Sequence, residues 1–366
     1  MTSNQPPTPP PGVPPQEPQW RAPASGPPPQ GRGASFFVAV FLGLLLLVSG
    51  GLNVMLLLLS FGSIASAGLG GLDGGDLGYD LVRVGGAASA PHKVLRIPIH
   101  GAIAEAENPV LGASGGMVTE VRRALRYAEN DDSVRGIWLS IDSPGGGVTD
   151  SDEIYRMLRR FKSNHPDVKV IALFGDIAAS GGYYVACAAD RIVARRSSIT
   201  GSIGVIMSAW NFAKAAQELG IEQVAIKSER TPYKDMLSPT RPMTDAEREI
   251  LTGIVDELYD QFVDVVDYGR RGLERDEVVQ LANGAIYSAE QARQNRLIDA
   301  IGDPVSVEEE FAADGPVQIV EHRRRPSLRD LLFGAAADAP DLSTAAARLL
   351  TAATGPRFLF YWQGAR

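Results

Sequence analysis

Residues 36–62, FFVAVFLGLLLLVSGGLNVMLLLLSFG, contain no charged side chain. A helix of about 20 apolar residues crosses a bilayer, so this run is long enough to span one with some tilt. Arg21 and Arg32 precede the run and aspartates follow it, which by the positive-inside rule places the N-terminus in the cytoplasm. We expect one transmembrane anchor over 35–62, in the cell (inner) membrane, with the bulk of the chain outside the cytoplasm. A signal peptide cleaved after residue 67 is the rival interpretation, but the apolar core of such a peptide is usually only about 7–15 residues long.

The segments on both sides of this run differ in composition from the rest of the chain. Residues 1–34 hold about half of the 25 prolines and are expected to form a disordered cytoplasmic tail. Residues 63–91 are rich in Gly, Ala and Asp, so we expect a flexible linker there. Residues 92–325 are expected to form the folded domain. Residues 326–366 are expected to be a C-terminal tail that either packs on this domain or contacts a neighbouring subunit or the membrane.

Short apolar runs rich in β-branched residues alternate with helical patterns through the expected domain. This alternation is typical of an α/β fold with a mostly parallel, buried sheet. The expected strands are 93–101, 136–142, 169–175, 191–195, 202–206, 223–228 and 317–322. The expected helices are 117–130, 149–163, 180–189, 209–219, 244–271, 274–282 and 288–295.

The composition excludes several classes of function. The formal net charge is −8, which argues against a nucleic-acid partner. The single cysteine, Cys187, permits no intrachain disulfide, and the cysteine and the four histidines have no zinc-site spacing. No phosphate-binding loop and no dinucleotide-binding glycine motif is present, so we expect neither a metal nor a nucleotide cofactor.

Two strand-to-helix turns carry candidate chemistry. The glycines of SPGGG, residues 143–147, allow backbone amides to face an anion or a carbonyl oxygen, although a plain tight turn also explains them. Ser180 begins a helix after the strand 169–175, where a serine either caps the helix or acts as a nucleophile. No GxSxG motif supports a Ser-His-Asp triad. A neutral lysine can serve as the base instead, and both Lys227 and Lys234 are candidates.

Five motifs occur in a fixed order along the chain: SPGGG (143–147), AASGGYYVACAAD (178–190), ITGSIGVI (199–206), KSERTPYKDMLSPTRPMTDAER (227–248) and GAIYSAEQARQNRLIDAIGD (284–303). Their order and spacing resemble the SppA-type signal peptide peptidases, a family of membrane-anchored Ser–Lys serine proteases. The resemblance covers about residues 92–335 and the N-terminal anchor. Clp proteases and crotonase-type acyl-CoA enzymes share the first motif, whereas the combination is specific.

The resemblance implies a role for each matching side chain. Ser180 would be the nucleophile and Lys234 the general base. Lys227 is the alternative base, because this chain has a longer SERTPY stretch where the family has a shorter, Gly-containing turn. Ser202 would orient the lysine amine.

The resemblance also implies an oxyanion site made by the amides of Gly146 and Gly181, and no metal or cofactor. The implied fold is a Clp/crotonase-like spiral, of which several copies assemble into a homo-oligomeric ring. The implied activity is endopeptidase hydrolysis of cleaved signal peptides and other apolar peptides through an acyl-enzyme. Two alternatives differ in class: a crotonase-type acyl-CoA enzyme, which would bind a CoA ester, and a catalytically inactive membrane scaffold.

Overall fold

The computed structural model describes residues 41–51, 53–54, 79–105, 116–324 and 357–361. The chain divides into two compact units, residues 1–75 and 76–366. In the first unit, residues 41–51 and 53–54 are helical. Within the described ranges, none of the helices combines the length and the hydropathy that a bilayer crossing requires. Much of the expected anchor 35–62 and all of the expected tail 1–34 lie outside these ranges, so both stay predictions.

The second unit is built on a sheet of nine strands among the described residues. Its main path runs β1-β11-β2-β3-β5-β6-β10, and β7 and β9 extend it beside β5. All neighbours pair in parallel except β1 with β11 and β7 with β9, so the expected α/β fold with a mostly parallel sheet is confirmed. The strands are β1 (Tyr79–Gly86), β2 (His92–His100), β3 (Val134–Ser143), β5 (Lys169–Ala179), β6 (Arg191–Ala194), β7 (Ile199–Gly201), β9 (Ile286–Ser288), β10 (Ala300–Ile301) and β11 (Val317–Arg324).

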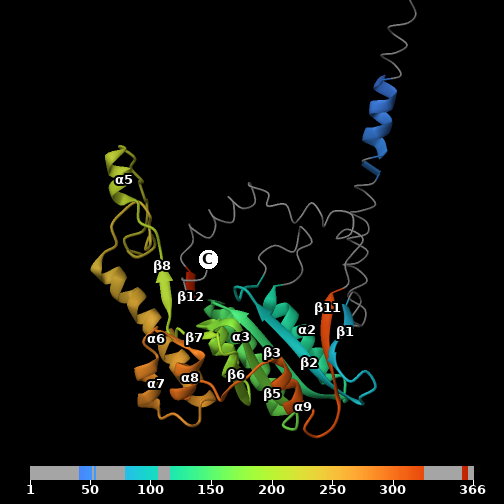
Figure 1. Cartoon of the computed structure of the whole chain (residues 1–366). Helices are drawn as coiled ribbons and strands as arrows, with labels where there is room; N and C mark the ends of the chain where they lie inside the picture. The colour runs from blue at the N-terminus through green and yellow to red at the C-terminus, as the bar shows by residue number, and fades with distance from the viewer. Residues whose placement is uncertain (1–40, 52, 55–78, 106–115, 325–356, 362–366) are drawn as a thin grey trace, which may run out of the picture. The chain divides into compact units, whose positions relative to one another are not determined.

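The central strands are apolar on both faces because helices cover both sides of the sheet (Figure 1). In β3, Ile137, Leu139 and Ile141 belong to the larger core, while Trp138 faces a smaller core that includes Val307 of α9 (Pro304–Phe311). This alternation follows from the two-residue period of a strand. The helices are α2 (Met117–Glu129), α3 (Val148–Asn164), α4 (Gly181–Ala186), α5 (Ala213–Glu218), α6 (Asp245–Gly269), α7 (Arg275–Leu281), α8 (Ala289–Gln294) and α9 (Pro304–Phe311).

A second, smaller sheet lies next to the turn between β3 and α3. It contains β4 (Gly145–Gly147), β12 (Arg357–Tyr361) and β8 (Ile206–Ser208), in the order β4-β12-β8. The central strand β12 pairs antiparallel with both of its neighbours. The C-terminal segment therefore contacts the glycine turn that the sequence singled out.

Two of the expected strands are wrong. Residues 223–228 form no strand; Val224 is 76% exposed and Ile226 is 96% exposed, and no neighbouring strand pairs with them. An apolar run forms a strand only where a partner accepts its main-chain hydrogen bonds. The expected strand 202–206 falls mostly between β7 and β8, because Ser202 adopts a φ of 50° and ends β7.

Two stretches that composition marked as linker or tail contain strands. Part of the expected linker 63–91 forms β1, whose register with β11 runs from Tyr79–Arg324 to Gly86–Gln318. Part of the expected tail 326–366 forms β12. The folded unit therefore begins before His92, and the Clp/crotonase-like spiral stays a prediction.

Candidate active site

Ser180 occupies the junction between β5 and α4 in a backbone conformation that is rare for serine. Its φ is 53° and its ψ is −117°, outside the helical region, and conformations of this kind cost roughly 1–3 kcal/mol. The surroundings hold it there: the Ser180 amide donates to the Gly201 carbonyl at 2.8 Å, and the Tyr184 amide donates to the Ser180 carbonyl at 2.9 Å. The Ser180 side chain makes no capping hydrogen bond, so the capping interpretation is wrong. Strain of this kind is typical of functional positions.

Gly146 and Gly181, the expected oxyanion glycines, adjoin each other. A Cβ built on Gly181 would lie 3.2 Å from the Gly146 nitrogen. Gly181 is the first residue of α4, so its N–H lacks an intrahelical acceptor. The Ile103 amide donates to Gly145 and the Gly147 amide donates to Ile103, both at 2.9 Å. Successive residues of a strand point their amides to opposite edges, so the N–H of Gly146 faces away from Ile103, toward β12.

Ser202 lies beside Ser180 because two parallel strands end together. Ala179 of β5 pairs with Gly201 of β7, so Ser180 and Ser202 are the next residues along each strand. Ser202 also has a positive φ, 50°, and its amide donates to the Ala285 carbonyl at 2.7 Å. The structure thus brings together Ser180, Ser202 and both glycines.

Neither candidate lysine joins this group within one chain. Lys227 and Lys234 lie between α5 and α6, in a segment that Figure 1 places beside α5, away from the sheet. Lys234 is exposed, and within the described ranges its amine has no hydrogen-bond or ion-pair partner. The Lys227 amine donates to the Pro232 carbonyl at 2.7 Å and forms an ion pair with Asp235. The Lys227 amine is therefore already bound to Pro232 and Asp235, whereas the Lys234 amine is available to bind another group.

An ion-pair network fixes the lysine segment to the start of α6. Asp235 accepts hydrogen bonds from Arg241 and Lys227, which hold the pKa of its carboxyl well below the usual range. Arg241 also binds Glu247 and, together with the Thr244 amide, lowers the pKa of Glu247 to about 2. Thr244 and Glu247 form the capping box of α6. The position of Lys234 is thereby linked to α6.

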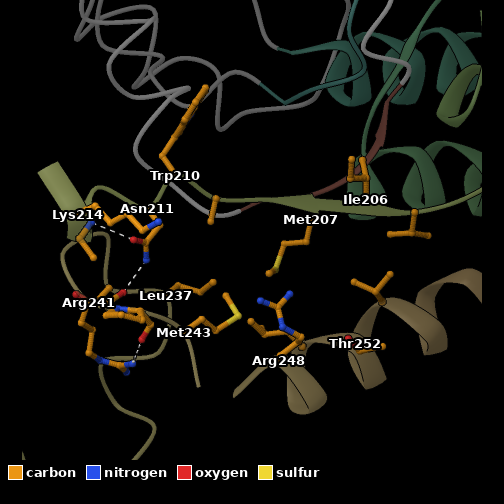
Figure 2. A pocket seen from close by; sticks show the side chains of 17 residues that line it. Ile206, Met207, Trp210, Asn211, Lys214, Leu237, Arg241, Met243, Arg248 and Thr252 are labelled. Atoms are coloured by element: carbon orange, nitrogen blue, oxygen red, sulfur yellow. Dashed lines mark hydrogen bonds between the residues drawn. The ribbon is translucent and has the colours of Figure 1, made fainter. Parts of the chain in front are cut away.

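A cavity of about 730 Å³ with a mixed apolar and polar lining lies between β8, the segment after it and α6 (Figure 2). Its apolar lining includes Met207, Trp210, Leu237, Met243 and Leu251. The Asn211 side chain donates to the Arg241 carbonyl at 2.6 Å, which fixes one wall. Since β8 belongs to both the cavity and the small sheet, an extended chain next to β8 has apolar surface beside it.

Ser151 is a polar residue at the site that the sequence reasoning missed. Its hydroxyl lies 2.5 Å from where a Cβ on Gly181 would be. The side chain is buried, and its oxygen has no hydrogen-bond partner within the described ranges. In the sequence, Ser151 is marked only by its position in the first turn of the helix after SPGGG. Serines are common in the first turn of helices, so this position alone does not indicate a functional residue.

The two tyrosines of the SGGYY motif belong to the core. Tyr183 is fully buried and donates to the Leu297 carbonyl at 2.8 Å. Tyr184 donates to Asp152 at 2.8 Å and accepts from Gln261 at 3.0 Å. Both anchor α4, and with it Ser180, to neighbouring elements.

Comparison with known proteins finds a matching family and several relatives that are named as proteases. Residues 162–315 match Peptidase family S49, a range that contains Ser180, Ser202 and Lys234 and begins after Gly146. A protein from Enterococcus faecium named as a signal peptide peptidase SppA is 34% identical over 211 residues, which cover 57% of this chain and 60% of the relative. A Synechocystis protein named as a protease is 38% identical over 214 residues, covering 58% and 71%. The chloroplastic serine protease SPPA of Arabidopsis thaliana is 30% identical over 233 residues, covering 63% and 32%.

Proposed function

Because this chain belongs to peptidase family S49, a family of SppA-like serine proteases, we propose that it is a membrane-anchored endopeptidase that hydrolyses cleaved signal peptides and other apolar peptides. The setting of Ser180 is the observation that supports this most strongly. Ser180 is only 1% exposed in the single chain, its backbone is strained, and the amides of Gly146 and Gly181 lie beside it. A nucleophile next to two backbone amide donors is the arrangement that acyl transfer requires.

In the proposed reaction, the neutral amine of Lys234 takes the proton of the Ser180 hydroxyl while Oγ bonds to the carbonyl carbon of the scissile peptide. The carbonyl oxygen becomes an oxyanion that accepts from the Gly146 and Gly181 amides, each worth about 3 kcal/mol in the transition state. The C–N bond then breaks, and the lysine ammonium gives its proton to the leaving amine. The same lysine deprotonates a water molecule that hydrolyses the acyl-enzyme and releases Ser180. Ser202 would hold the amine in place.

A second copy of the chain would supply Lys234. Within one chain this lysine lies on the segment between α5 and α6, which Figure 1 shows beside α5 and away from the main sheet. Its exposed amine has no partner among the described residues, so it is free to enter a neighbouring site. Contact with a neighbour would remove the amine from water, which favours the neutral form that a general base needs.

The surface around this lysine supports assembly into a homo-oligomeric ring. Six large apolar side chains on the two segments that flank α5 are each more than half exposed: Trp210 and Phe212 before it, and Leu219, Ile221, Val224 and Ile226 after it. Apolar surface of this extent usually marks a contact between proteins. A ring would cover this surface and bring each Lys234 to the next Ser180, since a head-to-tail contact repeats until it closes.

The sequence and the relatives support the proposed substrate class and location. A relative is named as a signal peptide peptidase, and the apolar side chains that line part of the cavity beside β8 suit apolar peptides. The uncharged run 36–62 would anchor the chain in the cell membrane, with the N-terminus cytoplasmic and the catalytic domain outside. Signal peptides are released into that same membrane.

The test uses the full chain in detergent with a mixture of apolar, signal-peptide-like peptides, and mass spectrometry maps the products. Ser180→Ala should lower the cleavage rate by roughly 10³-fold or more, because the nucleophile is lost. Ser163→Ala, an exposed serine on α3, is the matched control and should cleave like the parent. Lys234→Arg should also be inactive, because a guanidinium keeps its proton.

Mixing the two inactive variants tests where the lysine comes from. If each site combines Ser180 of one copy with Lys234 of the next, rings assembled from equal amounts of Ser180→Ala and Lys234→Arg should regain about a quarter of the parent rate. A lysine that acts within its own chain would give no recovery. Equal cleavage by the parent and Ser180→Ala would remove Ser180 from the mechanism. A folded, assembled parent that cleaves nothing would favour the scaffold.

A further inference from the structure

A second cavity, of about 540 Å³, lies where α6 ends and is lined mainly by polar side chains. Natural small-ligand sites have volumes of about 300 to 1,000 Å³, so this space is large enough for one. Two carboxylates, Asp190 and Asp299, line it together with six cationic side chains: Arg159, Lys162, Arg270, Arg271, Arg293 and Arg296. The whole chain carries a formal net charge of −8, so this positive charge is a local feature. We call this space the arginine cavity.

Hydrogen bonds to backbone carbonyls hold three of these cations in place. The Lys162 amine donates to the Ala188 carbonyl at 3.0 Å. The Arg270 Nε donates to the Arg296 carbonyl at 2.9 Å, and the Arg296 guanidinium donates to the Gly272 carbonyl at 2.5 Å. Cationic groups that are already fixed lose little conformational freedom when an anion binds, so more of the attraction is kept as affinity.

The positive charge of the arginine cavity is only partly balanced. Four of its cations have an acidic partner: Lys162 with Asp190, Arg270 with Asp299, Arg293 with Glu290, and Arg296 with Glu277. Arg159 and Arg271 have none among the described residues. The Arg159 guanidinium lies 4.1 Å from the centre of the Tyr268 ring and donates to its hydroxyl, while Arg271 is exposed. A ligand with two negative charges would balance these two guanidinium groups.

Arg296 adopts a backbone conformation that glycine usually supplies. Its φ is 58°, and it follows the last turn of α8, where the Leu297 amide donates back to the Ala292 carbonyl at 2.8 Å. Helices often end in this way with glycine at the left-handed position, because a Cβ is strained there. The strain at Arg296 persists where its guanidinium reaches the arginine cavity, and strain of this kind is typical of functional positions.

From these observations we propose that the arginine cavity binds a phosphomonoester, either free or as the headgroup of a lipid. A phosphomonoester carries nearly two negative charges at neutral pH, which matches the two guanidinium groups without an acidic partner. Its terminal oxygens accept the paired N–H groups of arginine. The cavity includes Cys187 at the C-terminal end of α4, whereas Ser180 precedes the first residue of that helix, so the inference is independent of hydrolysis at Ser180.

The decisive variant is Arg271→Gln in the full chain, titrated with phenyl phosphate in an uncharged detergent and followed by calorimetry. Arg271 is exposed and has no partner within the described ranges, so the fold should not change. The parent should bind the probe and the variant should bind it about tenfold or more weakly, because a charge-assisted hydrogen bond is lost. Arg126→Gln removes an exposed arginine of α2 and should bind like the parent.

Three results of this titration would overturn the inference. The parent could fail to bind phenyl phosphate. Arg271→Gln could bind it as tightly as the parent. The control Arg126→Gln could weaken binding as much as Arg271→Gln does, which would show that only the total charge of the chain matters.

A second variant, Arg296→Gly, separates binding from folding. Glycine relieves the positive φ, and the lost pair with Glu277 is exposed and contributes little. We expect an unchanged or higher thermal midpoint of unfolding, together with about tenfold weaker binding of phenyl phosphate. If this variant lost stability and binding together while Arg271→Gln bound like the parent, the arginines would serve the fold and the inference would fail.

The source of the phosphate is distinguished by comparing three probes on the parent: inorganic phosphate, dihexanoyl phosphatidic acid and dihexanoyl phosphatidylcholine. Tighter binding of phosphatidic acid than of inorganic phosphate would assign the cavity to a lipid headgroup. Equal binding of these two would assign it to the phosphate group alone. Phosphatidylcholine has no net charge and should not bind, so binding of it as tight as that of phosphatidic acid would contradict the inference.

Discussion

The close approach of Ile103 to Gly146 gives the sharpest test of the proposed oxyanion site. A Cβ on Gly146 would lie 2.0 Å from the Ile103 carbonyl oxygen, and the neighbouring Ile103 atoms would be 2.6 Å away. These are backbone atoms, so no side-chain rotation relieves the contact. Gly146→Ala must therefore push the two backbones apart by about 1 Å or more, since Cβ atoms keep about 3 Å or more from such neighbours.

The expected magnitudes follow from the bonds at this point. The separation weakens two hydrogen bonds, from the Ile103 amide to Gly145 and from the Gly147 amide to Ile103. At about 1 kcal/mol each, the free energy of unfolding should fall by about 2 kcal/mol. The Gly146 amide moves with its strand, and loss or misplacement of one oxyanion donor by about 1 Å costs about 10²-fold in kcat.

Peptide-cleavage kinetics and urea unfolding of the same preparation measure the two effects separately. Gly253→Ala is the matched control: it lies inside α6 with no atom within 4 Å of its new Cβ, so unfolding should become about 1 kcal/mol less favourable and kcat should not change. A Gly146→Ala variant that loses stability but keeps kcat would remove this amide from the oxyanion site. Unchanged stability would refute the close contact with Ile103 itself.

Two further predictions concern titratable groups. Hydrogen bonds from Arg241 and from the Thr244 amide lower the pKa of Glu247 from 4.5 to about 2, so its contribution to stability is present above about pH 4.5 and is lost as the pH falls toward 2. Glu247→Gln should therefore flatten the pH dependence of urea unfolding in that window, and an unaltered pH profile would contradict the ion pair. Burial raises the pKa of Cys187 to about 12, so its thiol should resist iodoacetamide at pH 8 until the chain is unfolded in guanidinium. Rapid labelling of the folded chain would show that the thiol is accessible.

The buried centre of the fold could be predicted because it leaves a direct trace in the sequence. Residues 169–175 form an apolar run whose alternate side chains enter two different cores, so the whole run stays apolar. The turn at SPGGG could also be predicted, because close backbone packing requires glycine there and glycine is visible in the sequence. Gly146 must be glycine because Ile103 leaves no room for a side chain.

The edges of the fold could not be predicted, because their partners lie far away in the sequence. The strand β1 forms only because residues 317–324 pair with it. Its alternation of apolar and polar residues is short and follows a Gly- and Asp-rich stretch, so composition alone marked the whole stretch as a linker. β12 depends in the same way on β4 and β8. Conversely, residues 223–228 have the alternation of a strand and no partner. The positive φ of Ser180 could not be predicted from the sequence. Tertiary contacts impose this backbone conformation, and no residue type or local pattern marks the position.

The proposed function places separate conditions on one site. Ser180, Ser202 and the glycine amides belong to one chain, where the paired ends of β5 and β7 and the turn after β3 bring them together before any assembly. The base lies on an exposed segment that a second copy would cover. An isolated copy would then have a nucleophile without a base. Hydrolysis would therefore need assembly, and an unassembled copy in the membrane would not cleave its neighbours.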